Sequence, residues 1–76
     1  MMAENWQSIG GANRDMFLVG KDWTGPENVE AILNDNDDIM AMRATFTKPD
    51  GARVRANRKH LARSVKHVLQ KMEPFP

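Results

Sequence analysis

The sequence predicts an α+β fold, in which a small antiparallel three-stranded sheet packs with two helices in the order β-α-β-β-α. Three observations predict this fold: apolar and polar residues alternate over 39–47, a turn signal follows at 48–51, and apolar residues recur at three- and four-residue spacing over 57–72. Two helices on one face of such a sheet would bury the apolar sides of both layers.

The first strand and the first helix are expected in the N-terminal half. Residues 16–19 (Met-Phe-Leu-Val) form a short apolar run that Gly20 closes, which favours a buried strand. Residues 24–27 (Thr-Gly-Pro-Glu) have the form of a capping box, in which the threonine and glutamate side chains satisfy the first amide groups of a helix. The helix is expected to end near Asn34, because the residues that follow favour turns.

The second half predicts a hairpin followed by a helix. Residues 39–47 form the first strand of the hairpin, residues 48–51 (Lys-Pro-Asp-Gly) its turn, and residues 52–56 the return strand. Asn57 can then cap a helix that runs to about Met72. The side chains expected to face inward from the two strands are Met40, Met42, Ala44, Phe46, Ala52, Val54 and Ala56.

Length and composition limit the organisation of the chain. Seventy-six residues have material for one hydrophobic core, so a single domain is expected over 1–76. Within it, residues 1–13 are expected to form a flexible arm and residues 73–76 a short extended tail. The absence of cysteine excludes disulfide bonds and thiolate chemistry, and it favours a cytoplasmic location. No apolar run approaches the roughly 18 residues of a membrane span, so no membrane contact is expected.

Charge is distributed unevenly along the chain. Residues 1–42 carry eight acidic and two basic side chains, whereas residues 43–76 carry nine basic and two acidic ones, which leaves the whole chain at +1. One interpretation is structural, because two oppositely charged halves of a small domain attract each other. The other is a positive face that binds an acidic partner.

The strongest charge signal is a run of seven basic residues, without an acidic one, between Gly51 and Met72. A continuous positive surface of this kind suits phosphates or a carboxylate-rich protein. The alternative is a solvated helix face, although such faces normally mix both signs. No aromatic residue is interleaved with these cations to stack on nucleic-acid bases. The residues expected to bind a partner are Arg53, Arg55, Arg58, Lys59, Arg63 and Lys66, with Trp6 and Phe75 as apolar anchors.

The sequence predicts no catalytic residue, no metal site and no cofactor. His60 and His67 are seven residues apart, a spacing that does not match a helical metal-binding pair. Residues 35–38 superficially resemble a calcium loop, but Met40 stands where an EF-hand requires glycine. No serine has the surroundings of a catalytic nucleophile. We therefore expect a protein that is not an enzyme.

These features favour a small regulatory or inhibitory protein that occupies a surface of a larger macromolecular machine. Its basic residues would speed encounter with an acidic surface, and an apolar anchor would set the rate of dissociation. In size, lack of motifs and charge layout, the chain resembles the small bacteriophage proteins that attach to host machinery, among them inhibitors of host RNA polymerase and anti-CRISPR proteins. The resemblance covers no aligned stretch. It implies the transcription machinery as the first target and the host cytoplasm as the location, and we expect a monomer.

Two other classes of function remain open. The same basic surface, over 51–72, would allow a small nucleic-acid-binding protein to contact phosphates, and nuclease treatment of a bound complex separates this class from the first. A self-associating structural component is the third class, because oppositely charged halves can join copies head to tail. A self-associating protein would show a particle size, measured by light scattering, that increases with protein concentration.

Overall fold

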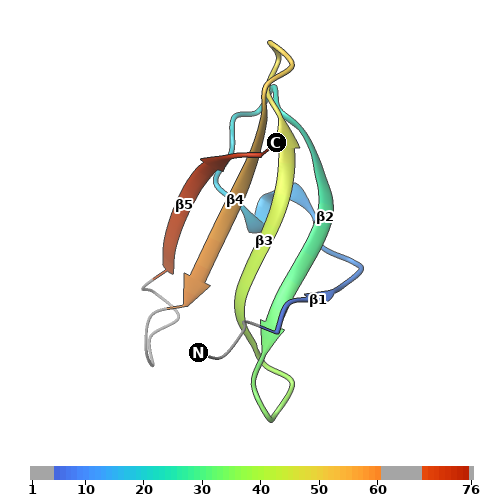
Figure 1. Ribbon diagram of the computed structural model, residues 1–76, viewed down its shortest axis with the longest axis vertical. Coiled ribbons are helices and arrows are strands. Elements are labelled where there is room, and N and C mark those ends of the chain that lie inside the picture. The colour runs from blue at the N-terminus through green and yellow to red at the C-terminus, as the bar shows by residue number, and fades with distance from the viewer. Residues whose placement is uncertain (1–4, 61–67, 76) are drawn as a thin grey trace.

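The computed structural model describes residues 5–60 and 68–75. Within them, five strands form one antiparallel sheet in which each strand pairs with the next along the chain (Figure 1). The elements are β1 (Gln7–Ser8), a 3-10 helix η1 (Arg14–Met16), β2 (Thr24–Leu33), β3 (Ile39–Thr47), β4 (Arg53–His60) and β5 (Val68–Pro74). No helix in these residues has the length and hydropathy to cross a membrane.

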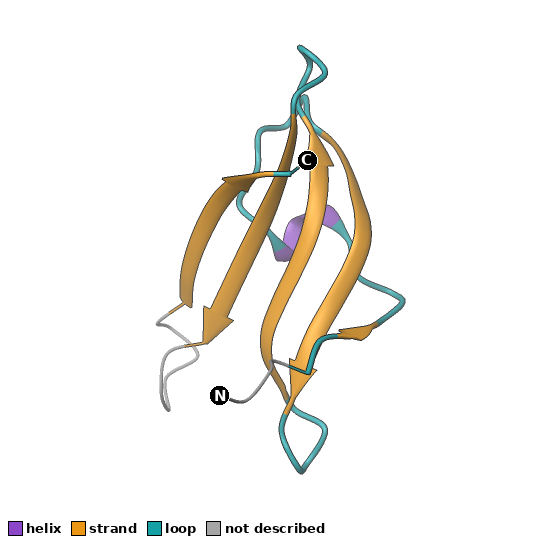
Figure 2. Ribbon diagram, viewed as in Figure 1, coloured by secondary structure: helices purple, strands orange, loops and turns teal. Residues whose placement is uncertain are grey.

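The predicted α+β class is wrong. In the described part of the chain the only helical element is η1, three residues long, and five strands replace the expected three (Figure 2). The first predicted helix is strand β2. The second is divided between the end of β4 and most of β5, and its residues 61–67 lie outside the described residues.

Strand β2 shows why the capping signal at residues 24–27 misleads. Gly25 has a φ of 129°, a backbone conformation that is not helical, and Asn28 has a φ of 53°. These two residues coincide with shifts of register between β2 and β3, so the strand is irregular there. An isolated helix of this length is marginal in water, whereas pairing along β3 satisfies the same backbone groups. Long-range pairing therefore overrides the local signal.

The turn between β2 and β3 agrees with the turn-forming composition seen in the sequence. Asn34 accepts hydrogen bonds at its Oδ1 from the backbone N–H groups of Asn36, at 2.8 Å, and Asp38, at 2.9 Å. An asparagine side chain that binds the backbone in this way stabilises a turn. It ends a strand here, although the sequence predicted that it would end a helix.

The strand over 39–47 and the turn at 48–51 are confirmed. Lys48 donates its N–H to the carbonyl of Ala52 at 2.8 Å, and Gly51 donates to the carbonyl of Lys48 at 2.9 Å with a φ of 89°. The return strand starts at Arg53 and continues to His60, so it is longer than predicted. Two residues expected to face inward, Met40 and Ala52, are exposed instead.

The core lies on one face of the sheet, here called the inner face. Residues 9–23, here called the covering segment, pass over this face, behind the sheet in Figure 1. The predicted strand at 16–19 is part of this segment and does not pair, because Phe17 inserts into the core and contacts Phe46 edge to face at 5.4 Å between ring centroids. The buried apolar side chains of the cluster are Phe17, Ala31, Met42, Ala44, Phe46, Val54 and Ala56.

Candidate functional site

The opposite, or outer, face of the sheet carries most of the polar side chains of the strands. Because side chains alternate along a strand, the register places one set of residues from each strand on this face. They are Glu27, Glu30 and Ile32 on β2, Ala41, Arg43, Thr45 and Thr47 on β3, Arg53, Arg55, Asn57 and Lys59 on β4, and Leu69, Lys71 and Glu73 on β5. Since the covering segment lies on the inner face, the outer face is where the sheet can meet a partner.

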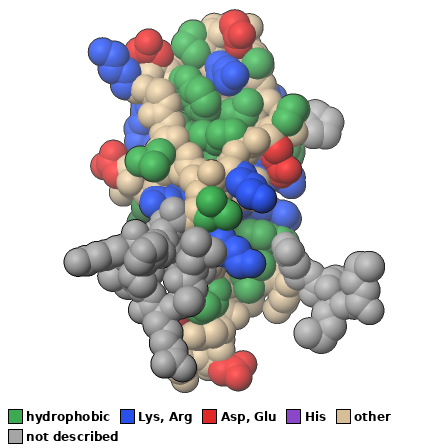
Figure 3. All heavy atoms as spheres, turned by 90° about the vertical axis from the view of Figure 1, so that its left-hand side faces the viewer, with side chains coloured by type: hydrophobic (Ala, Val, Ile, Leu, Met, Phe, Trp, Pro, Cys, Tyr) green, Lys and Arg blue, Asp and Glu red, His purple; other side chains and the backbone are tan. Residues whose placement is uncertain are grey.

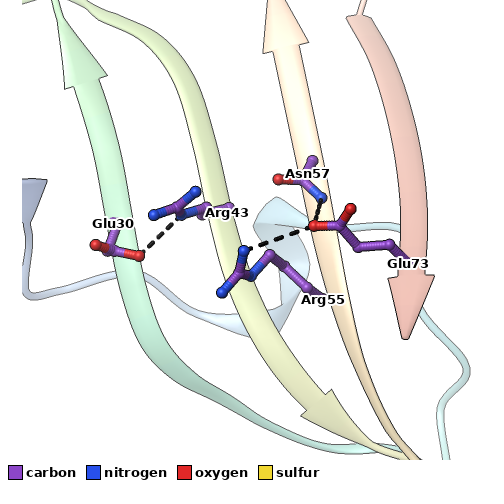
Figure 4. A network of polar contacts seen from close by, with 5 residues as sticks. All are labelled: Glu30, Arg43, Arg55, Asn57 and Glu73. Atoms are coloured by element: carbon purple, nitrogen blue, oxygen red, sulfur yellow. Dashed lines mark hydrogen bonds and ion pairs between the residues drawn. The ribbon is translucent and has the colours of Figure 1, made fainter. Parts of the chain in front are cut away.

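Ion pairs neutralise three arginines of the outer face. Arg43 Nε lies 2.8 Å from Glu30 Oε1, Arg53 Nη2 lies 3.5 Å from Glu27 Oε2, and Arg55 Nη1 lies 3.6 Å from Glu73 Oε1. The first two pairs join the acidic half of the chain to the basic half. This supports the structural interpretation of the charge pattern for these residues, and Figure 4 shows the first and third pairs.

The residues predicted to bind a partner are separated by the fold. Arg53, Arg55 and Lys59 alternate along β4 and share the outer face. Arg58 lies on the inner side, where its guanidinium donates a hydrogen bond to the carbonyl oxygen of Met16 and so fixes the covering segment. The two remaining residues, Arg63 and Lys66, lie outside the described residues.

Both predicted aromatic anchors lie against arginines. The guanidinium carbon of Arg43 is 4.1 Å from the ring centroid of Trp6, and those of Arg53 and Arg55 are 4.9 and 4.8 Å from that of Phe75. Aromatic rings and cations are therefore interleaved on the folded surface, although they are not interleaved in the sequence over 51–72. This arrangement is not visible in the sequence, because Trp6 and Phe75 come from opposite ends of the chain.

A hollow of about 300 Å³ lies at the end of the outer face near Trp6. The register explains its position, because one row across four strands contains Ile32, Ala41, Lys59 and Leu69. Ala41 is the smallest of these side chains and leaves space between its larger neighbours. The hollow is lined by Trp6, Ile32, Ala41, Asn57, Arg58, Lys59, Leu69 and Lys71.

Two lysines beside the hollow have no acidic partner among the described residues. Within residues 5–60 and 68–75, neither Lys59 nor Lys71 forms a salt bridge, and both are exposed. Lys59 is opposite Leu69 and Lys71 is opposite Asn57, so the two lysines are diagonal neighbours on one face. Two like charges at this spacing repel each other and create a local positive potential. Figure 3 shows Lys and Arg side chains around the middle of the side that carries β5.

Lys71 is a candidate binding residue that was not among those predicted from the sequence. It belongs to the run of basic residues over 51–72, but the predicted helix did not place it beside Lys59. Antiparallel pairing of β4 with β5 brings the two together. Apolar and polar residues do not alternate over 68–74, where Leu69 shares a face with Lys71 and Glu73, so the sequence carries no clear signal for this strand.

Comparisons of the chain with protein-family models, with curated proteins and with solved structures found no match. In the part of the chain that the structure describes, no three His, Asp or Glu side chains come together as a group that could hold a metal ion. The candidate site therefore rests on its own geometry: an apolar hollow, an indole ring at its wall and two lysines at its rim.

Proposed function

We propose that this chain is a non-catalytic binding protein that holds single-stranded nucleic acid on the outer face of its sheet. The observation that supports the proposal is the hollow beside Trp6, with Lys59 and Lys71 at its rim. An unpaired base is flat, and its two faces are apolar. Along the strand, a backbone phosphate lies on each side of the nucleotide that carries the base. The hollow can receive the base while the two lysines contact the phosphates.

A single strand fits this surface better than a duplex. In the described residues the longest helical element has three residues, so none can enter a major groove as the recognition helix of a helix-turn-helix protein does. The bases of a duplex are stacked and paired, and they cannot enter a hollow unless they are flipped out. A sheet that presents aromatic and basic side chains is the usual platform for unpaired bases.

The sequence favoured an acidic protein partner first and nucleic acid second, and the function proposed here is the second of these. The hypothesis of an acidic protein partner relied on Arg53 and Arg55 for long-range attraction. Their ion pairs with Glu27 and Glu73 weaken that attraction, since each pair is close to neutral at a distance. A target in the transcription machinery, and a bacteriophage source, stay predictions that no contact among the described residues supports.

Fluorescence anisotropy with a labelled 12-nucleotide single strand tests the proposal. We expect binding by the natural chain, weaker binding to the same sequence as a duplex, and at least a tenfold loss in Lys59→Glu. Lys21→Glu is the matched control, because it makes the same change of charge in the covering segment, away from the hollow. Equal losses in both variants, or no binding at all, would contradict a site at the hollow.

A further inference from the structure

Asn57 has a fixed orientation at the wall of the hollow. Its amide nitrogen Nδ2 donates a hydrogen bond to Glu73 Oε1 at 3.2 Å. An ionised carboxylate only accepts hydrogen bonds, so the NH₂ group, and not the carbonyl oxygen, must face Glu73. Figure 4 shows the amide oxygen of Asn57 directed away from the Glu73 carboxylate.

Glu73 is itself held in position. Arg55 Nη1 lies 3.6 Å from the same Oε1 atom that accepts from Asn57, so the carboxylate is placed between two donors. Arg55 in turn lies against the ring of Phe75 at 4.8 Å. Because these contacts hold the amide in one orientation, and no described residue donates to the Asn57 carbonyl oxygen, this oxygen is available as a hydrogen-bond acceptor.

An acceptor at this point distinguishes between bases. Cytosine and adenine each carry an exocyclic amino group that donates hydrogen bonds, whereas thymine and uracil carry a carbonyl oxygen at the corresponding position. A carbonyl oxygen of the base would face the carbonyl oxygen of Asn57, and neither group can donate. The amide orientation therefore favours a base that carries its amino group at this position, as cytosine and adenine do.

We infer that the hollow selects cytosine or adenine over thymine or uracil through the Asn57 carbonyl oxygen, with Glu73 as the positioning residue. The inference rests on the proposed function, since it names the base that the proposed site prefers. One neutral hydrogen bond contributes about 0.5–1.5 kcal/mol, which corresponds to a preference of roughly 2- to 12-fold.

The experiment compares oligodeoxycytidine with oligodeoxyuridine, both 12 nucleotides long, in competition for the natural chain at neutral pH. These two bases have the same ring size and differ at the amino position, so stacking on Trp6 is nearly matched. We expect cytidine to bind roughly 2- to 12-fold more tightly. An oligomer of N4,N4-dimethylcytidine, which lacks the amino donor, should lose this preference.

Two variants separate positioning from general binding. In Glu73→Gln the new amide can donate or accept, so Asn57 is no longer held in one orientation and the cytidine-to-uridine ratio should fall toward one. Glu30→Gln removes the same charge from the outer face without touching Asn57, and it should leave the ratio unchanged. Circular dichroism confirms that each variant is folded.

The possible results distinguish the two proposals. If cytidine and uridine bind equally, and Lys59→Glu weakens both, the selection by Asn57 is overturned while single-strand binding stands. If neither oligomer binds, the proposed function fails and the inference fails with it. A cytidine preference that Glu73→Gln leaves intact assigns the selection to another group and overturns the role of Glu73.

Discussion

Gln70 and Leu18, which are 52 residues apart in the sequence, exchange two hydrogen bonds. The N–H of Leu18 donates to Gln70 Oε1 at 2.9 Å, and Gln70 Nε2 donates to the carbonyl oxygen of Leu18 at 2.7 Å. The side-chain amide thus pairs with the backbone as a peptide group of a neighbouring strand would. Because Leu18 follows Phe17, this contact holds the covering segment where Phe17 enters the core.

Substituting Gln70 should loosen the covering segment. Gln70→Met keeps the length of the side chain and removes both hydrogen bonds, and we expect it to lower the free energy of unfolding by about 1–2 kcal/mol, because the exposed groups of Leu18 can bind water instead. Urea denaturation followed by circular dichroism measures the change. A loss within the error of the wild-type value would indicate that the contact does not hold the segment.

Gly25 is a position where a side chain cannot be added. A Cβ there would lie 2.9 Å from both Phe46 Cδ1 and the Thr45 carbonyl oxygen, and the φ of 129° is unfavourable for any other residue. We expect Gly25→Ala to destabilise the fold by about 2 kcal/mol or more. Gly10→Ala is the control, since nothing lies within 4 Å of its Cβ and it should be nearly neutral in the same thermal denaturation experiment.

Among the described residues, Phe46 is the largest fully buried side chain, at 1% exposure. Phe46→Ala should cost about 3–5 kcal/mol, which is comparable to the whole stability expected of so small a domain, so we expect the variant to be largely unfolded at 25 °C. Phe46→Leu should remain folded with a lower melting temperature. Leu18→Ala removes a side chain that is 72% exposed and should leave the melting temperature close to that of the natural chain.

Binding to a single strand should have a shallow dependence on salt. Each phosphate contacted in single-stranded nucleic acid contributes a slope of about −0.7 to the plot of log affinity against log salt concentration. Two lysines at the hollow therefore predict a slope near −1.4, and Lys71→Ala should reduce it to about −0.7. A slope several times steeper in the natural chain would mean that the paired arginines also release their carboxylates and bind phosphate.

The parts of the fold that the sequence predicts correctly depend on neighbouring residues. Alternation over 39–47 and the proline and glycine of the turn at 48–51 act within a few residues, so both are visible without the rest of the chain. The irregular strand β2 is different, because its backbone is stabilised by pairing with β3. Its own residues at 24–27 have the pattern of a helix N-terminus. The second predicted helix was wrong because its apolar residues recur at three- and four-residue spacing, which indicates a helix locally, whereas pairing of β5 with β4 satisfies the same backbone groups in a strand.

The candidate site was only partly predictable, because it depends on which residues share a face. The basic run over 51–72 correctly drew attention to Lys59, but counting charges along the chain could not pair Arg55 with Glu73 or Arg43 with Glu30. Those pairs follow from the register of the sheet. Trp6 reaches the hollow for the same reason, since β1 pairs with β2 and places Trp6 beside Ile32.

The hydrogen bond from the N–H of Phe75 to the carbonyl of Arg53, at 3.1 Å, determines which way the backbone of β5 faces. In an antiparallel ladder, the N–H and C=O groups of successive residues point alternately toward the paired strand and away from it. Phe75 bonds to β4, so the backbone nitrogen and carbonyl of Pro74 point away from β4, toward the edge of the sheet. Proline has no N–H to offer there. Edge-to-edge association, by which exposed strands of different molecules join into aggregates, therefore lacks a donor at this end of β5.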